Sequence, residues 1–270
     1  MRTIEIFPCG RMALLLVAGL GGLHAAAPAT GGGLRELNTD RPDATESPFT
    51  VDAGHLQLEM DATTYTRNRL DGVRTTEWVF APLNLRYGVT PNFEAGIFLT
   101  PHVRVTEQAR SGPKTTMRGV GDTTVRAKIN FWGNNGGGGA FGLIADLKLP
   151  TAADGIGNDK VEGALTFPVA VEIGAGWEGG AMTTVEWVQT GAGRRAVWAN
   201  TLTFARELTP DTGAFLELTS AAGDGAHVAT FNCGLTRKLG ANVQLDCGVN
   251  IGLSRTAPDL SVFAGVTRRY

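Results

Sequence analysis

The stretch G-D-T-T-V-R-A-K-I-N-F, residues 121–131, is decisive for the fold class. Apolar residues such as Val125, Ala127 and Ile129 alternate with polar ones such as Arg126 and Lys128. Successive side chains of a strand point to opposite faces of a sheet, so strict alternation predicts a β-strand with one apolar and one polar face.

The same alternation recurs through residues 54–270 and predicts about twelve strands, several of them about 10–13 residues long, which suffices for a tilted strand to cross a bilayer. The second strand is expected over residues 74–87. Glycine contributes 37 of the 270 residues, about twice its usual share, which favours an all-β chain with many turns. No apolar run is long enough for a transmembrane helix.

The connections between these strands differ in length on the two sides. Those after even-numbered strands are mostly short, whereas the longest, residues 101–118 and 150–160, follow odd-numbered strands. Outer-membrane barrels have short periplasmic turns and longer extracellular loops, and a soluble β-sandwich has no reason to alternate in this way. Because lipid cannot form hydrogen bonds with the backbone, every N–H and C=O group must be paired within the sheet, and the sheet must therefore close. We therefore predict a transmembrane antiparallel β-barrel of about 12 strands, with both chain ends periplasmic and its apolar face toward outer-membrane lipid.

The N-terminus predicts export. Arg2 and Arg11 are followed by the short apolar run 12–23 and by small residues, so we expect residues 1–29 to be a signal peptide cleaved between about 25 and 29. A buried or disordered N-terminal helix is the alternative. Localisation in the outer membrane of a Gram-negative bacterium follows from export and the barrel together.

Residues 30–53 are expected to be an extended periplasmic lead-in segment, because Pro42 and Pro48 are incompatible with a helix. The segment is dense in charge. One hypothesis is that it enters the periplasmic mouth as a plug and pairs with luminal Arg126 and Lys128; a periplasmic tail or a solvated surface segment is the alternative. The candidate plug residues are Asp40, Arg41, Asp43 and Glu46.

Charged residues on the polar faces of the strands are candidates for lining the lumen. They can form a salt-bridge network that fills a narrow lumen, or a lining that selects solutes. A wide pore is not expected, because spacious channels have about 16–18 strands. The candidates are Glu94, Asp122, Arg126, Lys128, Asp146, Lys148 and Glu172.

Two cysteines remain after the signal peptide. Cys233 and Cys247 are symmetric about Gly240, so a hairpin turn there would make them cross-strand neighbours within disulfide reach. They can equally be two small apolar residues on one face. Aromatic residues expected at the membrane interfaces are Tyr87, Trp177, Trp187 and Trp198.

Neither an enzyme nor a nucleic-acid partner is predicted. The net charge is −2 and no basic stripe with interleaved aromatic residues occurs. His102 and His227 lie near loop ends, with Asp224 close to His227, but no pattern ties them to a nucleophile, so an outer-membrane hydrolase is a minor alternative. No ligand spacing for a metal is found and no cofactor is expected.

Residues 39–48, T-D-R-P-D-A-T-E-S-P, followed by Val51, Gly54, Gln57 and Glu59, closely resemble the opening signature of an outer-membrane family. The stretches L-R-Y-G-V-T (85–90), G-V-G-D (119–122), L-K-L-P-T (147–151), Q-L-D-C-G (244–248) and A-P-D (257–259) agree in order. The family is described as "putative MetA-pathway of phenol degradation", and its members are often called transporters.

The resemblance implies a signal peptide, an outer-membrane barrel and passage of small organic compounds, including aromatic or hydrophobic, phenol-like ones. A structural or adhesive barrel with a filled lumen is the alternative. The C-terminal strand ending at Tyr270 is expected to meet the barrel-assembly machinery. Arg268 departs from the apolar residue typical of that position. Two consequences are open: weaker recognition by the machinery, or an Arg268 side chain that extends to the lipid headgroups.

Overall fold

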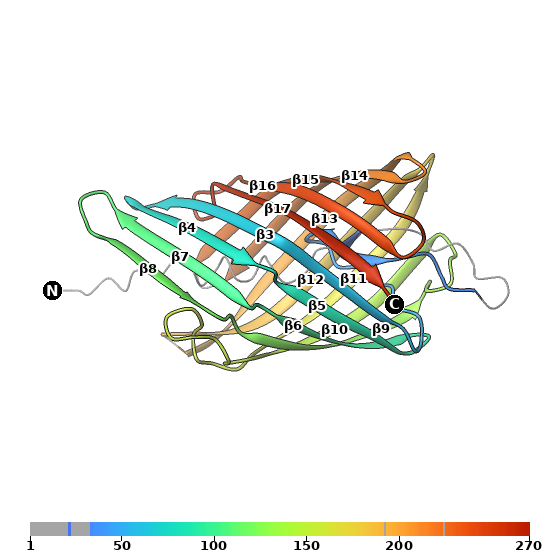
Figure 1. Cartoon of the computed structure of the whole chain (residues 1–270), viewed down its shortest axis with the longest axis horizontal. Helices are drawn as coiled ribbons and strands as arrows, with labels where there is room; N and C mark the ends of the chain where they lie inside the picture. Colours follow the sequence, from blue (N-terminus) through green and yellow to red (C-terminus); the bar gives the residue numbers. More distant parts are fainter. Residues whose placement is uncertain (1–20, 23–32, 192, 224) are drawn as a thin grey trace.

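The computed structural model describes residues 21–22, 33–191, 193–223 and 225–270, and these are built from β-strands and connecting segments (Figure 1). No helix among these residues is long and apolar enough to cross a membrane. Fifteen strands form one sheet, and the pairing of the last strand with the first of them closes it into a barrel. The strands are β3 (Leu56–Leu70), β4 (Val73–Phe80), β5 (Leu83–Thr90), β6 (Phe93–Leu99), β7 (His102–Ala109), β8 (Lys114–Gly119), β9 (Thr123–Trp132), β10 (Gly139–Leu149), β11 (Glu162–Gly174), β12 (Trp177–Thr190), β13 (Gly193–Thr209), β14 (Thr212–Gly223), β15 (Ala226–Lys238), β16 (Val243–Gly252) and β17 (Leu260–Arg269).

Three barrel strands are interrupted, so the fifteen segments make twelve barrel strands. The pairs β4 and β5, β6 and β7, and β8 and β9 each continue one another across a break of two or three residues. The predicted closed antiparallel barrel of twelve strands is therefore confirmed. The prediction of one unbroken second strand over 74–87 is wrong: Ala81, at a φ of 49°, precedes Pro82 and bends the chain there.

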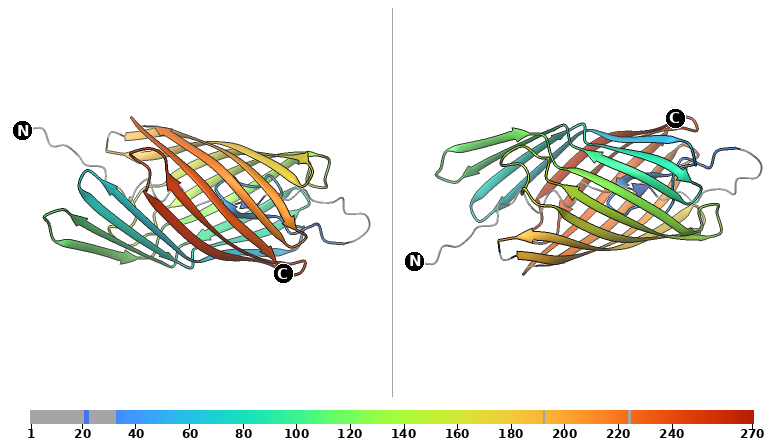
Figure 2. Two further views of the ribbon diagram at one scale, coloured as in Figure 1. Left: turned by 90° about the horizontal axis from the view of Figure 1, so that it is seen from above. Right: turned by 90° about the horizontal axis from the view of Figure 1, so that it is seen from below.

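The predicted long polar loop at residues 101–118 is also wrong. This stretch is the hairpin β7–β8, in which charged residues such as Arg104 alternate with Val103 and Val105. β4 pairs with β7, and β7 with β8, so the wall continues past the rest of the barrel as a sheet that projects at one end (Figures 1 and 2). The difference in loop length between the two ends of the barrel is therefore smaller than the sequence suggests. On the side where long loops are expected, for example, β3 and β4 are joined by Asp71 and Gly72 alone.

The two faces of the barrel wall have reversed polarity relative to a soluble protein. Ile129 and Phe131 of β9 point outward with 39% and 51% of their surface exposed, while Arg126 and Lys128 point inward and are buried. A large apolar side chain left in water forgoes about 1.5–3 kcal/mol of burial free energy, so an outer face of such residues indicates contact with lipid. This face and the closed sheet place the protein in an outer membrane.

The two ends of the barrel sequence lie at one end of the barrel. The backbone N–H of Tyr270 donates to the carbonyl of Leu56 at 2.8 Å, and the Arg268 guanidinium lies 4.7 Å from the Tyr270 ring centroid. Most of the predicted signal peptide lies outside the described residues. Its Gly21 and Gly22 form β1 (Gly21–Gly22), which pairs with β2 (Thr39–Asp43), and a cleaved chain would lack this pairing.

The cysteines of the β15–β16 hairpin do not face each other. Cys233 pairs with Val249, and Cys247 with Leu235, so the hairpin is centred on Ala241 rather than Gly240. The shift of one position in the turn makes the two cysteines diagonal neighbours, which in a sheet are typically about 7–8 Å apart. Both are free thiols.

Candidate functional site: a lumen filled by the lead-in segment

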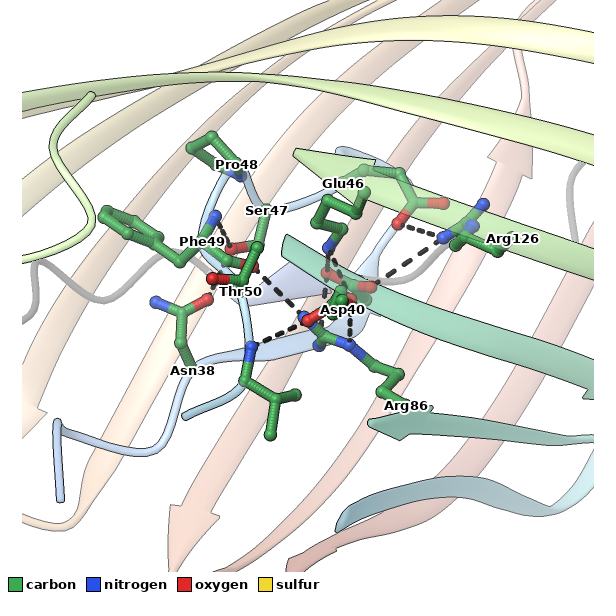
Figure 3. A network of polar contacts seen from close by, with 12 residues as sticks. Asn38, Asp40, Glu46, Ser47, Pro48, Phe49, Thr50, Arg86 and Arg126 are labelled. Carbon is green, nitrogen blue, oxygen red and sulfur yellow. Dashed lines mark hydrogen bonds and ion pairs between the residues drawn. The ribbon is translucent and has the colours of Figure 1, made fainter. Parts of the chain in front are cut away.

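The described part of the lead-in segment, residues 33–53, folds back into the barrel near its periplasmic end instead of trailing outside. Thr39, Asp40, Thr45 and Ser47 are each at most 1% exposed, and the loop that contains them lies among inward-facing side chains (Figure 3). A polar segment can be buried in this way only if the wall supplies partners for its hydrogen-bonding groups. The wall does so at several places.

The first place is the carboxylate of Asp40. It lies 2.5 Å from Lys128 Nζ. Arg86 Nη1 is 3.3 Å and Arg126 Nη1 is 3.7 Å from the same carboxylate (Figure 3). Its backbone N–H donates to Glu59, which is also paired with Arg86 at 2.6 Å. Burial would raise the pKa of Asp40, but the surrounding cations outweigh it and hold that pKa below its ordinary value.

The second place joins the segment to β9 and β10. Arg126 holds Glu46 through Nη1 at 2.8 Å and Asp146 through Nη2 at 2.7 Å, with its guanidinium 4.4 Å from the Phe98 ring centroid. Burial raises the pKa of Glu46 to about 8, although Arg126 opposes that shift. A fixed planar guanidinium suits this role because it can bond two carboxylates at once.

The third place is Arg41, which bonds Asp246 Oδ1 through Nη2 at 2.6 Å and contacts Asp61. These aspartates belong to β16 and β3, so one side chain of the segment bridges the seam where the barrel closes. The Phe263 ring lies beneath it, 5.9 Å from the guanidinium carbon to the ring centroid.

The fourth place is Glu217 of β14, on the other side of the lumen. Its carboxylate accepts hydrogen bonds from the Ala44 N–H at 2.9 Å, the Thr45 N–H at 2.7 Å and the Thr45 hydroxyl at 2.6 Å. Asp43 lies in the same neighbourhood and has no cationic partner among the described residues, so burial and the charge of Glu217 raise its pKa well above its ordinary value.

A second charged cluster lies at the extracellular end of β9–β11 and does not touch the lead-in segment. Lys148 Nζ is 3.2 Å from Asp122 and 2.8 Å from Glu162. Asp122 also accepts the Ala152 N–H at 2.9 Å, and so it fastens the connection between β10 and β11 to the wall.

The sequence-predicted residues therefore fall into three groups. Glu94, Arg126, Lys128 and Asp146 gather with Asp40 and Glu46 around the segment, and Asp122 and Lys148 form the extracellular cluster. Glu172 belongs to neither cluster: it is exposed at the periplasmic end of β11, where it lines a pocket together with Phe49 of the segment. Five further residues of the network are not among the candidates predicted from the sequence, although each occupies a polar-face position of its strand: Glu59, Asp61, Arg86, Glu217 and Asp246.

The middle of the opposite wall has a different character. The inward faces of β11–β15 are rich in threonine there, and neighbouring hydroxyls bond each other, as between Thr166 and Thr184 at 2.8 Å and between Thr219 and Thr230 at 2.7 Å. Thr201 bonds Thr45 of the segment at 2.7 Å. The lumen is thus ionic on one side and hydroxyl-lined on the other.

The histidines form no complete catalytic arrangement among the described residues. His227 Nε2 lies 3.0 Å from Ser220 Oγ, on the outer side of the β14–β15 hairpin, and no carboxylate among the described residues orients this pair. Asp224 lies outside the described residues. The His102 ring is tilted against the Phe80 ring, with 5.7 Å between the centroids. No group of three or more metal-binding side chains occurs in the described part of the chain.

A family model described as "Putative MetA-pathway of phenol degradation" matches residues 39–270. The chain belongs to this family. The match begins at Thr39, so the signature of this phenol-degradation family includes the part of the lead-in segment that enters the lumen. The resemblance found from the motifs is confirmed. No curated protein matches the sequence.

Three solved structures share the fold with this family member. The COG4313 outer membrane channel from Pseudomonas putida F1 is 16% identical with a TM-score of 0.59, over 83% of this chain and 98% of that one. The beta domain of the Bordetella autotransporter BrkA is 14% identical with a TM-score of 0.54, over 81% and 100%. The NanC porin is 8% identical with a TM-score of 0.51, over 79% and 98%. At these identities the likeness concerns the fold.

Proposed function

We propose that this barrel passes small uncharged organic compounds, including aromatic and hydrophobic ones such as phenols, across the outer membrane without covalent chemistry. The observation that carries the proposal is the division of the lumen. The cations that face the lead-in segment are engaged by carboxylates, which leaves few free charges to attract an ionic solute, while the threonine-rich side offers neutral hydroxyls.

Threonine hydroxyls both donate and accept hydrogen bonds, so they can exchange their mutual bonds for bonds to a phenolic or alcohol group. A neutral solute that passes in this way does not have to lose the tightly bound water that surrounds an ion. The membrane-channel and porin descriptions of the structurally similar proteins agree with passage of solutes.

In this proposal the lead-in segment is a plug that must loosen before a solute can pass. Within the described residues, the segment is held inside the lumen by noncovalent contacts, and it leaves the lumen at the periplasmic end, where Asp52 pairs with Arg35 at 2.6 Å and with Arg269 at 3.0 Å. Movement of residues 39–48 would open the part of the lumen that they fill while leaving the closed sheet intact.

Swelling of proteoliposomes tests the function. Dihydroxybenzenes should enter faster than sugars of similar mass, measured against protein-free vesicles that report diffusion through lipid alone. Deleting residues 39–48 should increase swelling for both solutes and raise single-channel conductance in planar bilayers.

The control for folding is the heat-modifiable gel mobility of the intact barrel. Equal, protein-independent swelling for all solutes with folded protein would refute passage and favour the alternative of a structural or adhesive barrel with a filled lumen. Unchanged conductance after the deletion would refute the plug.

A further inference from the structure

The sheet that projects beyond the barrel separates its charges by face. The projecting sheet consists of residues 63–70 of β3 together with β4, β7 and β8. Its outward positions contain no aspartate or glutamate, and its acidic residues, Glu77 and Glu107, occupy inward positions. The outward cations are Arg67, Arg69, Arg74, Arg104, Lys114 and Arg118.

The strand register places like charges directly opposite each other on this face. Arg69 pairs with Arg74, and Arg104 pairs with Arg118. Neighbouring strands are about 4.8 Å apart, and like charges directly opposite each other destabilise a sheet. An anion bound between them would remove this repulsion.

These cations are available to a ligand. Arg69, Arg74, Arg104, Lys114 and Arg118 are exposed, and none of the ion pairs of the described residues includes them. Arg67 alone faces a carboxylate, that of Asp259, at 3.9 Å.

Aromatic side chains mark the height of this face relative to the membrane. On the same outer surface, the Trp78 ring lies 4.7 Å from Tyr65 and 6.0 Å from Phe80, and the Phe80 ring lies 5.7 Å from His102, centroid to centroid. Trp78 is also directly opposite Arg104 in the register. Since aromatic girdles sit at the membrane–water interface, the cations lie level with the outer-leaflet headgroups and just above them.

We propose that this basic face binds the phosphate groups of a phosphorylated glycolipid of the outer leaflet. Guanidinium groups bond phosphate oxygens in pairs, and a headgroup with more than one phosphate could span the Arg69–Arg74 and Arg104–Arg118 pairs together. A membrane lipid fits better than a soluble anion because the cations stand directly above aromatic side chains on a lipid-facing wall. Binding would hold the projecting sheet, whose outermost strand β8 pairs only with β7, against the membrane surface.

Native mass spectrometry of the full-length mature barrel in detergent tests the proposal, with bisphosphorylated, monophosphorylated and dephosphorylated lipid A as probes. Wild-type protein should retain the bisphosphorylated form best and the dephosphorylated form least. The variant Arg74→Gln/Arg104→Gln/Arg118→Gln should weaken retention about a hundredfold, since each cation near a membrane surface contributes about a fivefold factor.

The matched control is Arg206→Gln/Arg237→Gln, which removes two outward arginines from the opposite, periplasmic end of the barrel. This variant should bind lipid A as the wild type does. Equal retention of all three lipids, or equal loss in the control and the triple variant, would overturn the proposal. Heat-modifiable mobility confirms that each variant is folded, and a loss of retention at high salt is expected for an electrostatic site.

Discussion

Replacing Arg126 by glutamine should make the barrel open more often. Arg126 connects the lead-in segment to β10, because its guanidinium bonds Glu46 at 2.8 Å and Asp146 at 2.7 Å. Glutamine keeps much of the volume but carries no charge, so Asp146 would lose its cation and Glu46 would lose its charged hydrogen-bond donor while both side chains stay buried.

The contacts set the size of the effect. Breaking a buried ion pair by removing one partner costs about 3–5 kcal/mol. Glu46 belongs to the segment and Asp146 to the wall, so roughly half of this cost, about 2 kcal/mol, opposes docking of the segment. Since about 1.4 kcal/mol is a factor of ten, the undocked population should rise about thirtyfold.

Single-channel recording in planar bilayers measures that population as the frequency of high-conductance openings. The matched control is Lys148→Gln, which breaks a wall-to-wall bridge between Asp122 and Glu162 and leaves the segment alone. Adding Glu46→Gln to Arg126→Gln should restore part of the closed behaviour, because it removes one of the orphaned carboxylates. Opening frequency in folded Arg126→Gln equal to that of wild type, or an equal increase in Lys148→Gln, would refute the reasoning.

Three further predictions concern the pH dependence of docking, the two cysteines and one closely packed glycine. The pKa of Glu46 in the docked segment is raised from its ordinary 4.5 to about 8, and that of Asp43 is also raised. The stabilisation that the protonated Glu46 gives to docking is therefore fully present below its ordinary pKa and is lost as the pH rises through about 8. Conductance should therefore increase over that range and lose most of its pH dependence in Asp43→Asn/Glu46→Gln; a pH profile unchanged by the substitutions would contradict this. The free thiols predict identical gel mobility with and without reductant and faster reaction of a maleimide with the exposed Cys247 than with the half-buried Cys233. Gly248→Ala would bring a Cβ within 2.5 Å of the Phe263 ring, so the unfolding midpoint on heat-modifiability gels should fall, by an amount that reflects about 1–3 kcal/mol of overpacking.

Local patterns in the sequence were sufficient for the fold class. Strict alternation in strands such as β9 and β10 identifies which residues face lipid and which face the lumen, because the side-chain period of a strand is two regardless of what surrounds it. The same alternation is present in β7 and β8. There, however, charged residues such as Arg104 and Arg118 make the stretch resemble a loop, and only the pairing of β7 with β4 shows that it is part of the barrel wall.

Partners across the lumen could not be predicted in the same way. Arg41 and Asp246 are separated by 205 residues, and Thr45 and Glu217 by 172, so no local pattern connects them. Whether Cys233 and Cys247 face each other depends on the position of the hairpin turn. The turn is centred one residue from the expected position, and such a shift changes every facing pair of the hairpin.

The sequence by itself determined that this chain is an outer-membrane barrel of the phenol-degradation family, because alternation and the motif at residues 39–48 are properties of consecutive residues. Only the tertiary structure decided which charges meet. Closure of the sheet brings β3, β9, β14 and β16 around one narrow space, and a buried carboxylate there must find a cation or a donor, whatever its distance along the chain.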